Sequence, residues 1–171
     1  MILSSQVREW GSGGQNTDAA STKTSLLVAI SIDDHYLLLP QREVFSLESV
    51  LDVKREGAQA PSSGTIELAG VEWPVYCLSG AALITTMDFP SQRRICLLLN
   101  DGHDYLAIAC DQIETLTRQP QGRFPLPPCQ AKADALIESL IVDEETVRCM
   151  TTTARLKRYC QRNGNRDTDY G

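Results

Sequence analysis

The feature of this sequence that most restricts its fold is an internal match between two separate stretches. Ile32–Leu39 and Asp101–Ile108 each contain an acidic turn with a histidine, followed by a tyrosine and an apolar, strand-like stretch. Eight residues after each tyrosine comes a β-branched aliphatic residue, Val44 in the first stretch and Ile113 in the second. A chain that repeats itself in this way is expected to fold as two related units.

A second match supports the repeat. Val75–Ser79 corresponds to Val147–Thr151, at nearly the same separation along the chain, and each stretch predicts a strand that ends in a hydroxyl residue before a short helical segment. The two halves then cover roughly 24–90 and 93–160. A unit of about 65 residues buries only about 60% of its unfolded surface and is marginally stable alone. We therefore expect two lobes packed side by side, with a groove between them that suits a docking partner.

The pattern of short apolar stretches and tight turns indicates an all-β fold. The segment 24–32 alternates in polarity and predicts a half-buried strand, and Asp33-Asp34 is expected to turn the chain into a return strand. Helical character is limited to 79–84 and 152–161, and 120–128 is expected to be a proline-rich loop. Strands are predicted at 24–32, 36–39, 44–54, 64–70, 72–78, 93–100, 103–110, 112–117, 135–142 and 146–150.

The two ends of the chain differ in composition from the rest. Residues 1–23 are rich in glycine, serine and threonine and predict a flexible segment, in which Trp10 is either an anchor for a partner or an exposed aromatic without a role. The domain is expected at 24–161 and a flexible tail at 162–171. The first ten residues have no apolar core of a signal peptide, and no apolar run is long enough to span a bilayer, so we expect a cytoplasmic protein without membrane insertion.

Charge and cysteine content narrow the function further. The formal net charge of −6 argues against binding to nucleic acid. Five basic residues within 155–171 are expected to offset the dipole of a C-terminal helix. The six cysteines form no C-x-x-C pair. They are expected to be reduced, with several buried as small apolar residues.

No motif predicts catalysis. The sequence contains no G-x-S-x-G, P-loop, H-E-x-x-H or G-x-G-x-x-G pattern. The two histidines, His35 and His103, fall in corresponding turns beside aspartates, where a solvated turn explains them better than a metal site. Cys77 and Cys149 occupy corresponding positions, which favours packing over a nucleophile. We expect no enzyme activity, no metal and no cofactor.

Residues 64–78 carry a resemblance to a known family. The stretch from Gly64 to Leu78, GTIELAGVEWPVYCL, resembles the CheW-family signature G-x-I-x-L-R-G-x-x-x-P-V-x-D-L. The matching positions are Gly64, Ile66, Leu68, Gly70, Pro74, Val75 and Leu78. The opening hairpin, the later hairpin at 95–111 and the closing strands and helix at 136–156 are also similar, so the resemblance covers about 24–160.

The resemblance implies a fold and a role. CheW-like proteins have two pseudo-symmetric small β-barrels, here with a short C-terminal helix, and no activity of their own. By resemblance, this protein is a scaffold that couples chemoreceptor-type sensors to a CheA-like histidine kinase, whose regulatory domain shares the fold and pairs with the adaptor barrel to barrel. The alternative interpretation is a ligand-sensing or regulatory β-barrel that has lost these scaffolding contacts.

The charged positions of the signature depart from the family pattern. Ala69 stands in place of the signature arginine, Cys77 in place of its aspartate, and Ser46 in place of the glutamate of V-x-E-I. The altered set is similar to divergent CheW-like proteins of type IV pilus chemosensory systems, which implies a role in twitching motility. Gly70→Asp is expected to disrupt the turn by steric and conformational cost. The expected partner-binding residues are Val44, Ser46, Leu47, Leu68, Ala69, Gly70 and Pro74.

Overall fold

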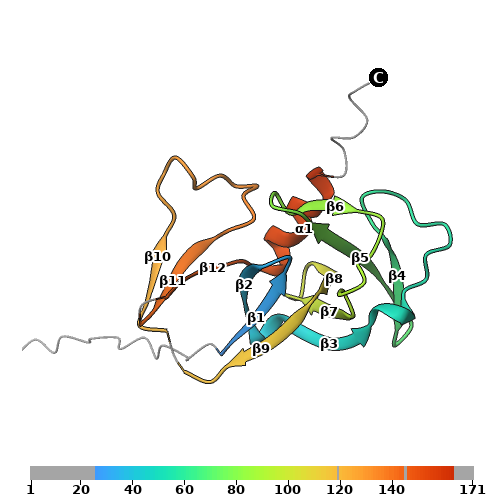
Figure 1. Ribbon diagram of the computed structural model, residues 1–171, viewed down its shortest axis with the longest axis horizontal. Coiled ribbons are helices and arrows are strands. Elements are labelled where there is room, and N and C mark those ends of the chain that lie inside the picture. The colour runs from blue at the N-terminus through green and yellow to red at the C-terminus, as the bar shows by residue number, and fades with distance from the viewer. Residues whose placement is uncertain (1–25, 119, 145, 164–171) are drawn as a thin grey trace, which may run out of the picture.

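The computed structural model describes residues 26–118, 120–144 and 146–163. It contains two six-stranded sheets and one α-helix, α1 (Thr153–Asn163), which confirms the predicted all-β class with a short C-terminal helix (Figure 1). The expected N-terminal segment 1–23, with Trp10, lies outside the described residues, and so does the expected tail from residue 164 onward. Residues 162 and 163, which were also assigned to the tail, belong to the helix.

The first sheet, sheet A, has the strand order β10-β11-β12-β2-β1-β9. The second, sheet B, has the order β3-β7-β8-β5-β4, with β6 paired to β5. Sheet A contains β1 (Leu27–Ile32), β2 (His35–Pro40), β9 (Gln112–Leu116), β10 (Gly122–Pro125), β11 (Ser139–Asp143) and β12 (Thr146–Met150). Sheet B contains β3 (Val44–Ser49), β4 (Gly64–Leu68), β5 (Val71–Ser79), β6 (Ile84–Thr86), β7 (Ile95–Asn100) and β8 (Tyr105–Cys110).

The two sheets share one strand arrangement, so the predicted pseudo-symmetry is confirmed. The central hairpin β1–β2 lies between β9 and the β11–β12 hairpin, as β7–β8 lies between β3 and the β4–β5 hairpin. Each central hairpin gives its next strand to the other sheet: β3 follows β2 but pairs with β7, and β9 follows β8 but pairs with β1. Sheet B therefore contains the strands within residues 44–110, and sheet A contains the strands before and after this range. The division of the sequence repeat into 24–90 and 93–160 stays a prediction.

Register shows which parts of the two sheets correspond. Val44 of β3 lies opposite Leu99, and Ile113 of β9 lies opposite Ile30. The sequence match makes Ile113 the counterpart of Val44, and the same alignment makes Leu99 the counterpart of Ile30. This equivalence between the sheets therefore follows directly from the sequence.

The β4–β5 and β11–β12 hairpins correspond with a different separation along the chain. Ile66 pairs with Trp73 in sheet B, and Ile141 pairs with Arg148 in sheet A, so Ile141 is the counterpart of Ile66. The second predicted match would instead make Glu138 the counterpart of Ile66, and it is therefore out of register. The residues at the ends of β5 and β12 are similar in sequence, but the tight turns that precede these two strands fix the alignment.

Both central hairpins are buried on two faces. In β1, Val28, Ile30 and Ile32 pack into the core between the sheets, while Leu27 and Ala29 pack on the other face of sheet A. The same division holds in β7 and β8. The expectation of a half-buried strand at 24–32 is therefore wrong, because every residue of β1 is buried.

Sheet B closes into a small barrel. After β3, a 3-10 turn (Val50–Asp52) brings Lys54 beside Thr65 of β4, where the two backbones exchange hydrogen bonds of 2.8 and 3.0 Å. A Cβ atom at Gly64 would lie 2.5 Å from a Val53 methyl group and 2.6 Å from the Lys54 carbonyl oxygen, so this closure requires glycine. Sheet A has no pairing between β9 and β10 among the described residues and forms an open half-barrel.

Two local predictions are wrong. The predicted helical turn at 79–84 is a tight turn that leads into β6, because Gly80 and Leu83 have φ angles of 77° and 49°, which do not occur in an α-helix. The predicted proline-rich loop contains β10. Pro125 fits there because β10 is an edge strand, where a missing N–H breaks no internal ladder.

Helix α1 is joined to the sheets by a buried carboxylate. Glu43 follows β2 in a 3-10 turn (Gln41–Glu43), and its Oε2 atom accepts hydrogen bonds from the Thr153 backbone N–H (2.8 Å) and hydroxyl (2.9 Å). A carboxylate at a helix N-terminus also interacts favourably with the helix dipole. Leu156 and Cys160 then pack into the core between the sheets.

A buried arginine links the β1–β2 turn of sheet A to sheet B. The Arg93 guanidinium is fully buried and lies 2.7 Å from both Asp33 and Asp111. It also donates to the Leu78 carbonyl oxygen at 2.6 Å. Asp33 sits in the β1–β2 turn with a φ angle of 44°, a left-handed conformation that aspartate tolerates better than most residues. The Arg93 guanidinium thus holds together the β1–β2 turn, strand β5 and the junction between β8 and β9.

Arg93→Met is expected to destabilise the protein by about 3–5 kcal/mol, because it leaves two carboxylates without their buried cation. Urea unfolding measures this cost. The control is Arg118→Met, which removes an exposed ion pair with Glu144 and is expected to cost about 1 kcal/mol or less. Equal effects of the two substitutions would contradict the structural role of Arg93.

The same network predicts a dependence of stability on pH. Hydrogen bonds from the Gly80 N–H and the Ser79 hydroxyl, together with Arg93, lower the pKa of Asp33 to about 2. In the unfolded chain this carboxyl has its ordinary pKa near 4, so its contribution is complete above about pH 5 and is lost as the pH falls toward 2. Asp33→Asn should flatten this part of the profile of unfolding free energy against pH. An unchanged profile would contradict the assignment.

Candidate partner-binding surface

Strand β3 forms one exposed edge of sheet B. Val44 packs partly against the core between the sheets, whereas the Leu47 side chain is 54% exposed. The Ser46 hydroxyl donates a hydrogen bond to the Glu48 carboxylate. A β-bulge lies between Val44 and Ser46, so Phe45 has no register partner in β7.

The β4–β5 turn forms the second part of the predicted surface. Ala69 and Gly70 are exposed and have φ angles of 52° and 75°, as a two-residue turn between twisted strands requires. Leu68 packs partly against the barrel core, and Pro74 pairs with Thr65 within the hairpin. The structure thus places only Leu47, Ala69 and Gly70 fully at the surface, while the other four predicted residues are half-buried.

An aromatic cluster connects the two parts. The Phe45 ring centroid lies 4.9 Å from that of Trp73, and Trp73 lies edge-on to Tyr105 at 5.4 Å. Trp73 fills the barrel between β3 and β5, and Lys157 of α1 lies 5.6 Å from the Tyr105 ring. Phe45 and Tyr105 were missed by the sequence analysis. Phe45 is exposed in alternation with Val44 and Ser46, as Leu47 is, so the alternating pattern of the strand could have indicated it.

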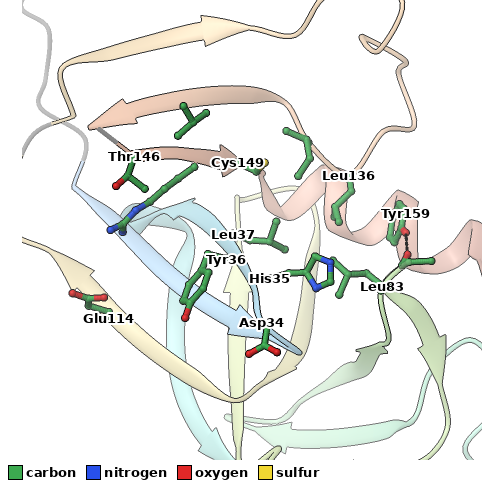
Figure 2. Close-up of a pocket in the computed structure, with 15 residues that line it drawn as sticks. Asp34, His35, Tyr36, Leu37, Leu83, Glu114, Leu136, Thr146, Cys149 and Tyr159 are labelled. Carbon is green, nitrogen blue, oxygen red and sulfur yellow. Dashed lines mark hydrogen bonds between the residues drawn. The ribbon is translucent and has the colours of Figure 1, made fainter. Parts of the chain in front are cut away.

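Of the groups considered for catalysis, His35 and Cys149 both line a cleft of sheet A (Figure 2), while Cys77 is buried in the barrel of sheet B. Burial raises the pKa of the Cys77 thiol to about 11 and those of Cys96, Cys110 and Cys160 to about 12, which disfavours the nucleophilic thiolate. The His35 Nδ1 atom lies 2.9 Å from the Asp33 carbonyl oxygen within its own turn.

Among the described residues, no three or more His, Cys, Asp or Glu side chains are grouped so that they could hold a metal ion. In the same residues, no helix is long and apolar enough to cross a membrane.

The comparisons with known proteins bear on the fold. No family model and no curated protein matches the sequence. Among solved structures, the scaffolding protein TtCheW from Thermoanaerobacter tengcongensis superimposes with a TM-score of 0.59 at 15% sequence identity, over 75% of this chain and 88% of that chain. The fold is CheW-like. The expected fold is thereby confirmed, and at this identity the match concerns the fold alone.

The CheW-like fold gives the signature residues 64–78 a structural meaning. The stretch forms the β4–β5 hairpin that closes the barrel of sheet B. Its glycines match the family because Gly64 permits a close backbone approach and Gly70 a left-handed turn. Ala69, at the position of the missing signature arginine, is exposed at the turn, and its φ angle of 52° is a left-handed conformation that glycine, asparagine and aspartate adopt more readily than alanine.

The expected effect of Gly70→Asp changes with the structure. A Cβ atom at Gly70 would meet nothing within 4 Å, so the expected steric cost is wrong and only the conformational cost remains. Aspartate tolerates the left-handed region, so Gly70→Asp should cost less than about 1 kcal/mol, whereas the β-branched Gly70→Val should cost about 1–2 kcal/mol. Thermal unfolding of both variants checks this, and equal losses would contradict it.

Proposed function

We propose that this protein is a non-catalytic cytoplasmic adaptor in chemotaxis-like signal transduction. The observation that carries the proposal is the CheW-like fold, which spans 88% of a protein described as a scaffolding protein. The sequence signature at 64–78 supports the same family independently of the superposition. Its partners would be the regulatory domain of a CheA-like histidine kinase and a chemoreceptor-type sensor.

The proposed contact surface consists of β3 and the β4–β5 turn. Edge strand β3 carries exposed Leu47 and Phe45, which supply apolar and aromatic area of the kind found at the centre of protein interfaces. The turn residues Ala69 and Gly70 project from the same barrel, and the contact between Phe45 and Trp73 fixes the geometry between the two parts.

The contact would be less polar than in relatives that keep the signature. Ser46 and Ala69 replace a glutamate and an arginine of the family pattern, so an ordinary chemotaxis kinase or sensor would lose charge-assisted hydrogen bonds to these positions. This favours a dedicated partner set with an apolar counterpart surface. The similarity to divergent proteins of type IV pilus systems points to control of twitching motility as the output.

A second candidate function is that of a ligand-sensing barrel. It is favoured by a cleft of about 600 Å³ in sheet A, a volume typical of small-molecule sites. A thermal-shift screen with metabolites separates the two candidates, because a ligand that binds only the folded state raises the unfolding temperature.

The adaptor function is tested by binding to the regulatory domain of a CheA-like kinase from the same genome. The wild-type chain is expected to bind, and Leu47→Glu is expected to weaken the affinity by roughly tenfold or more, because it places a charge in the apolar part of the interface. Isothermal titration calorimetry measures both affinities.

Phe124→Glu is the matched control. Phe124 lies on edge strand β10 of sheet A and is 52% exposed, close to the 54% of Leu47. Its substitution should leave the affinity within about twofold. Equal losses in both variants would contradict the assigned surface. Lack of binding to every kinase regulatory domain and sensor of the genome would contradict the adaptor function itself.

A further inference from the structure

The most exposed large apolar side chain among the described residues is that of Leu51, at 93%. Leu51 belongs to the 3-10 turn (Val50–Asp52) that follows β3 directly. Figure 1 shows this end of β3 at the periphery of sheet B, on the side away from β10 and β11. Phe45, Leu47 and Leu51 are all exposed and fall within residues 45–51. A single exposed leucine is common on protein surfaces, whereas a group of exposed apolar residues indicates a contact surface.

The turn that carries Leu51 is fixed to the barrel of sheet B. Val50 and Val53 pack partly against the barrel core. The Val50 N–H donates to the Arg94 carbonyl oxygen at 3.0 Å, and the Val53 N–H donates to the Val50 carbonyl oxygen at 3.2 Å. The Ser49 hydroxyl oxygen accepts a hydrogen bond from the Leu51 N–H at 3.1 Å. Leu51 therefore projects from a backbone that is ordered before any partner binds.

The Leu51 side chain has no part in the packing of the fold. It belongs to none of the three apolar clusters of the structure. Transfer of this side chain from water into an apolar site would be favourable, and the free chain offers no such site. Because the backbone is already ordered, burial in a complex would cost only the rotamer freedom of one side chain. An aliphatic residue presented in this way suits the role of an interface anchor.

We propose that Leu51 is the anchor of the proposed contact surface and inserts into an apolar pocket of the partner. A side chain that is exposed on nearly all sides loses most of its contact with water only when a pocket encloses it. Its exposed neighbours Asp52 and Arg94 argue against a flat apolar counterpart, which would cover both charges. They would instead form a polar rim around the pocket. The inference rests on the adaptor function and adds the shape of the partner's site.

The anchor is tested by the affinity for the regulatory domain of the CheA-like kinase, measured by isothermal titration calorimetry. Leu51→Ala is expected to weaken this affinity roughly tenfold or more, because the pocket loses its occupant. The melting temperature of the free protein should not change, since the side chain packs against neither sheet. Wild-type affinity in Leu51→Ala would overturn the proposal.

Ile84→Ala is the matched control. Ile84 lies on β6 of the same sheet, outside the proposed contact surface, and is 58% exposed. Its truncation also shortens an exposed aliphatic side chain, and it should leave the affinity within about twofold. An equal loss in Ile84→Ala and Leu51→Ala would overturn the assignment of the anchor to Leu51.

Two further substitutions of Leu51 distinguish a pocket from a flat contact. Leu51→Met conserves the volume of the side chain and should keep the affinity within about threefold. Leu51→Trp adds apolar area, which would strengthen binding to a flat surface. In a closed pocket the larger side chain does not fit, so we expect a loss of roughly tenfold. A gain of affinity with tryptophan would overturn the pocket.

Ser49 acts as a positioning residue for the anchor. Ser49→Ala removes the acceptor of the Leu51 N–H and should weaken binding about threefold, because the turn must then become ordered on binding. Ser49→Thr keeps the hydroxyl and should restore the wild-type affinity. In the Leu51→Ala background, Ser49→Ala should cause no further loss. Fully additive losses would overturn the positioning role.

These results separate the anchor from the function on which it rests. If Leu47→Glu weakens kinase binding but Leu51→Ala does not, the anchor alone is wrong. If the chain binds no kinase regulatory domain and no sensor, the adaptor function is contradicted, and the anchor with it. Sedimentation velocity tests a second copy of the chain as the alternative occupant. A monomer is expected at all concentrations, and a dimer that Leu51→Ala dissociates would overturn the assignment to a partner.

Discussion

The structure depends on two hairpins that are buried on both faces. β1–β2 and β7–β8 each place one set of side chains in the core between the sheets and the other set on the outer face of their own sheet. Neither hairpin can leave its partner without exposing aliphatic area on both sides. Because the chain continues from each hairpin into a strand of the opposite sheet, the two sheets are joined by the covalent chain as well as by packing. They should therefore unfold as one unit.

Polar groups fix the geometry of this apolar arrangement from two sides. Glu43 ties the N-terminus of α1 to the end of β2, and Arg93 joins the first turn to β5 and to the β8–β9 junction. Apolar burial alone is non-directional and would tolerate small shifts between the sheets. Buried charges that lose their partners are costly, so they favour one arrangement. The outer strands β3 and β10 and the β4–β5 turn are then held on a rigid support.

Much of this fold could be predicted from the sequence, because a repeat is visible in local patterns. The acidic turns, the strands after them and the equivalence of Val44 with Ile113 followed from residues close in the chain. Strand exchange was not predictable, since alternation shows that a strand exists but not which distant strand it pairs with. The true alignment of the β4–β5 hairpin with the β11–β12 hairpin was not visible in the sequence, because Trp73 and Arg148 occupy corresponding positions but are chemically unlike. The family signature predicted the turn at Gly70, whereas the contact between Phe45 and Trp73 depends on how distant strands are arranged, which no local pattern shows.

Amide hydrogen exchange in the presence of the cognate kinase regulatory domain tests the central claim most directly, because it maps a bound surface without altering any residue. Slower exchange is expected in 44–49 and 68–71, while exchange in 122–125 and 139–142 should not change. Unchanged exchange across sheet B, or protection confined to β10 and β11, would contradict the proposed binding through β3 and the β4–β5 turn.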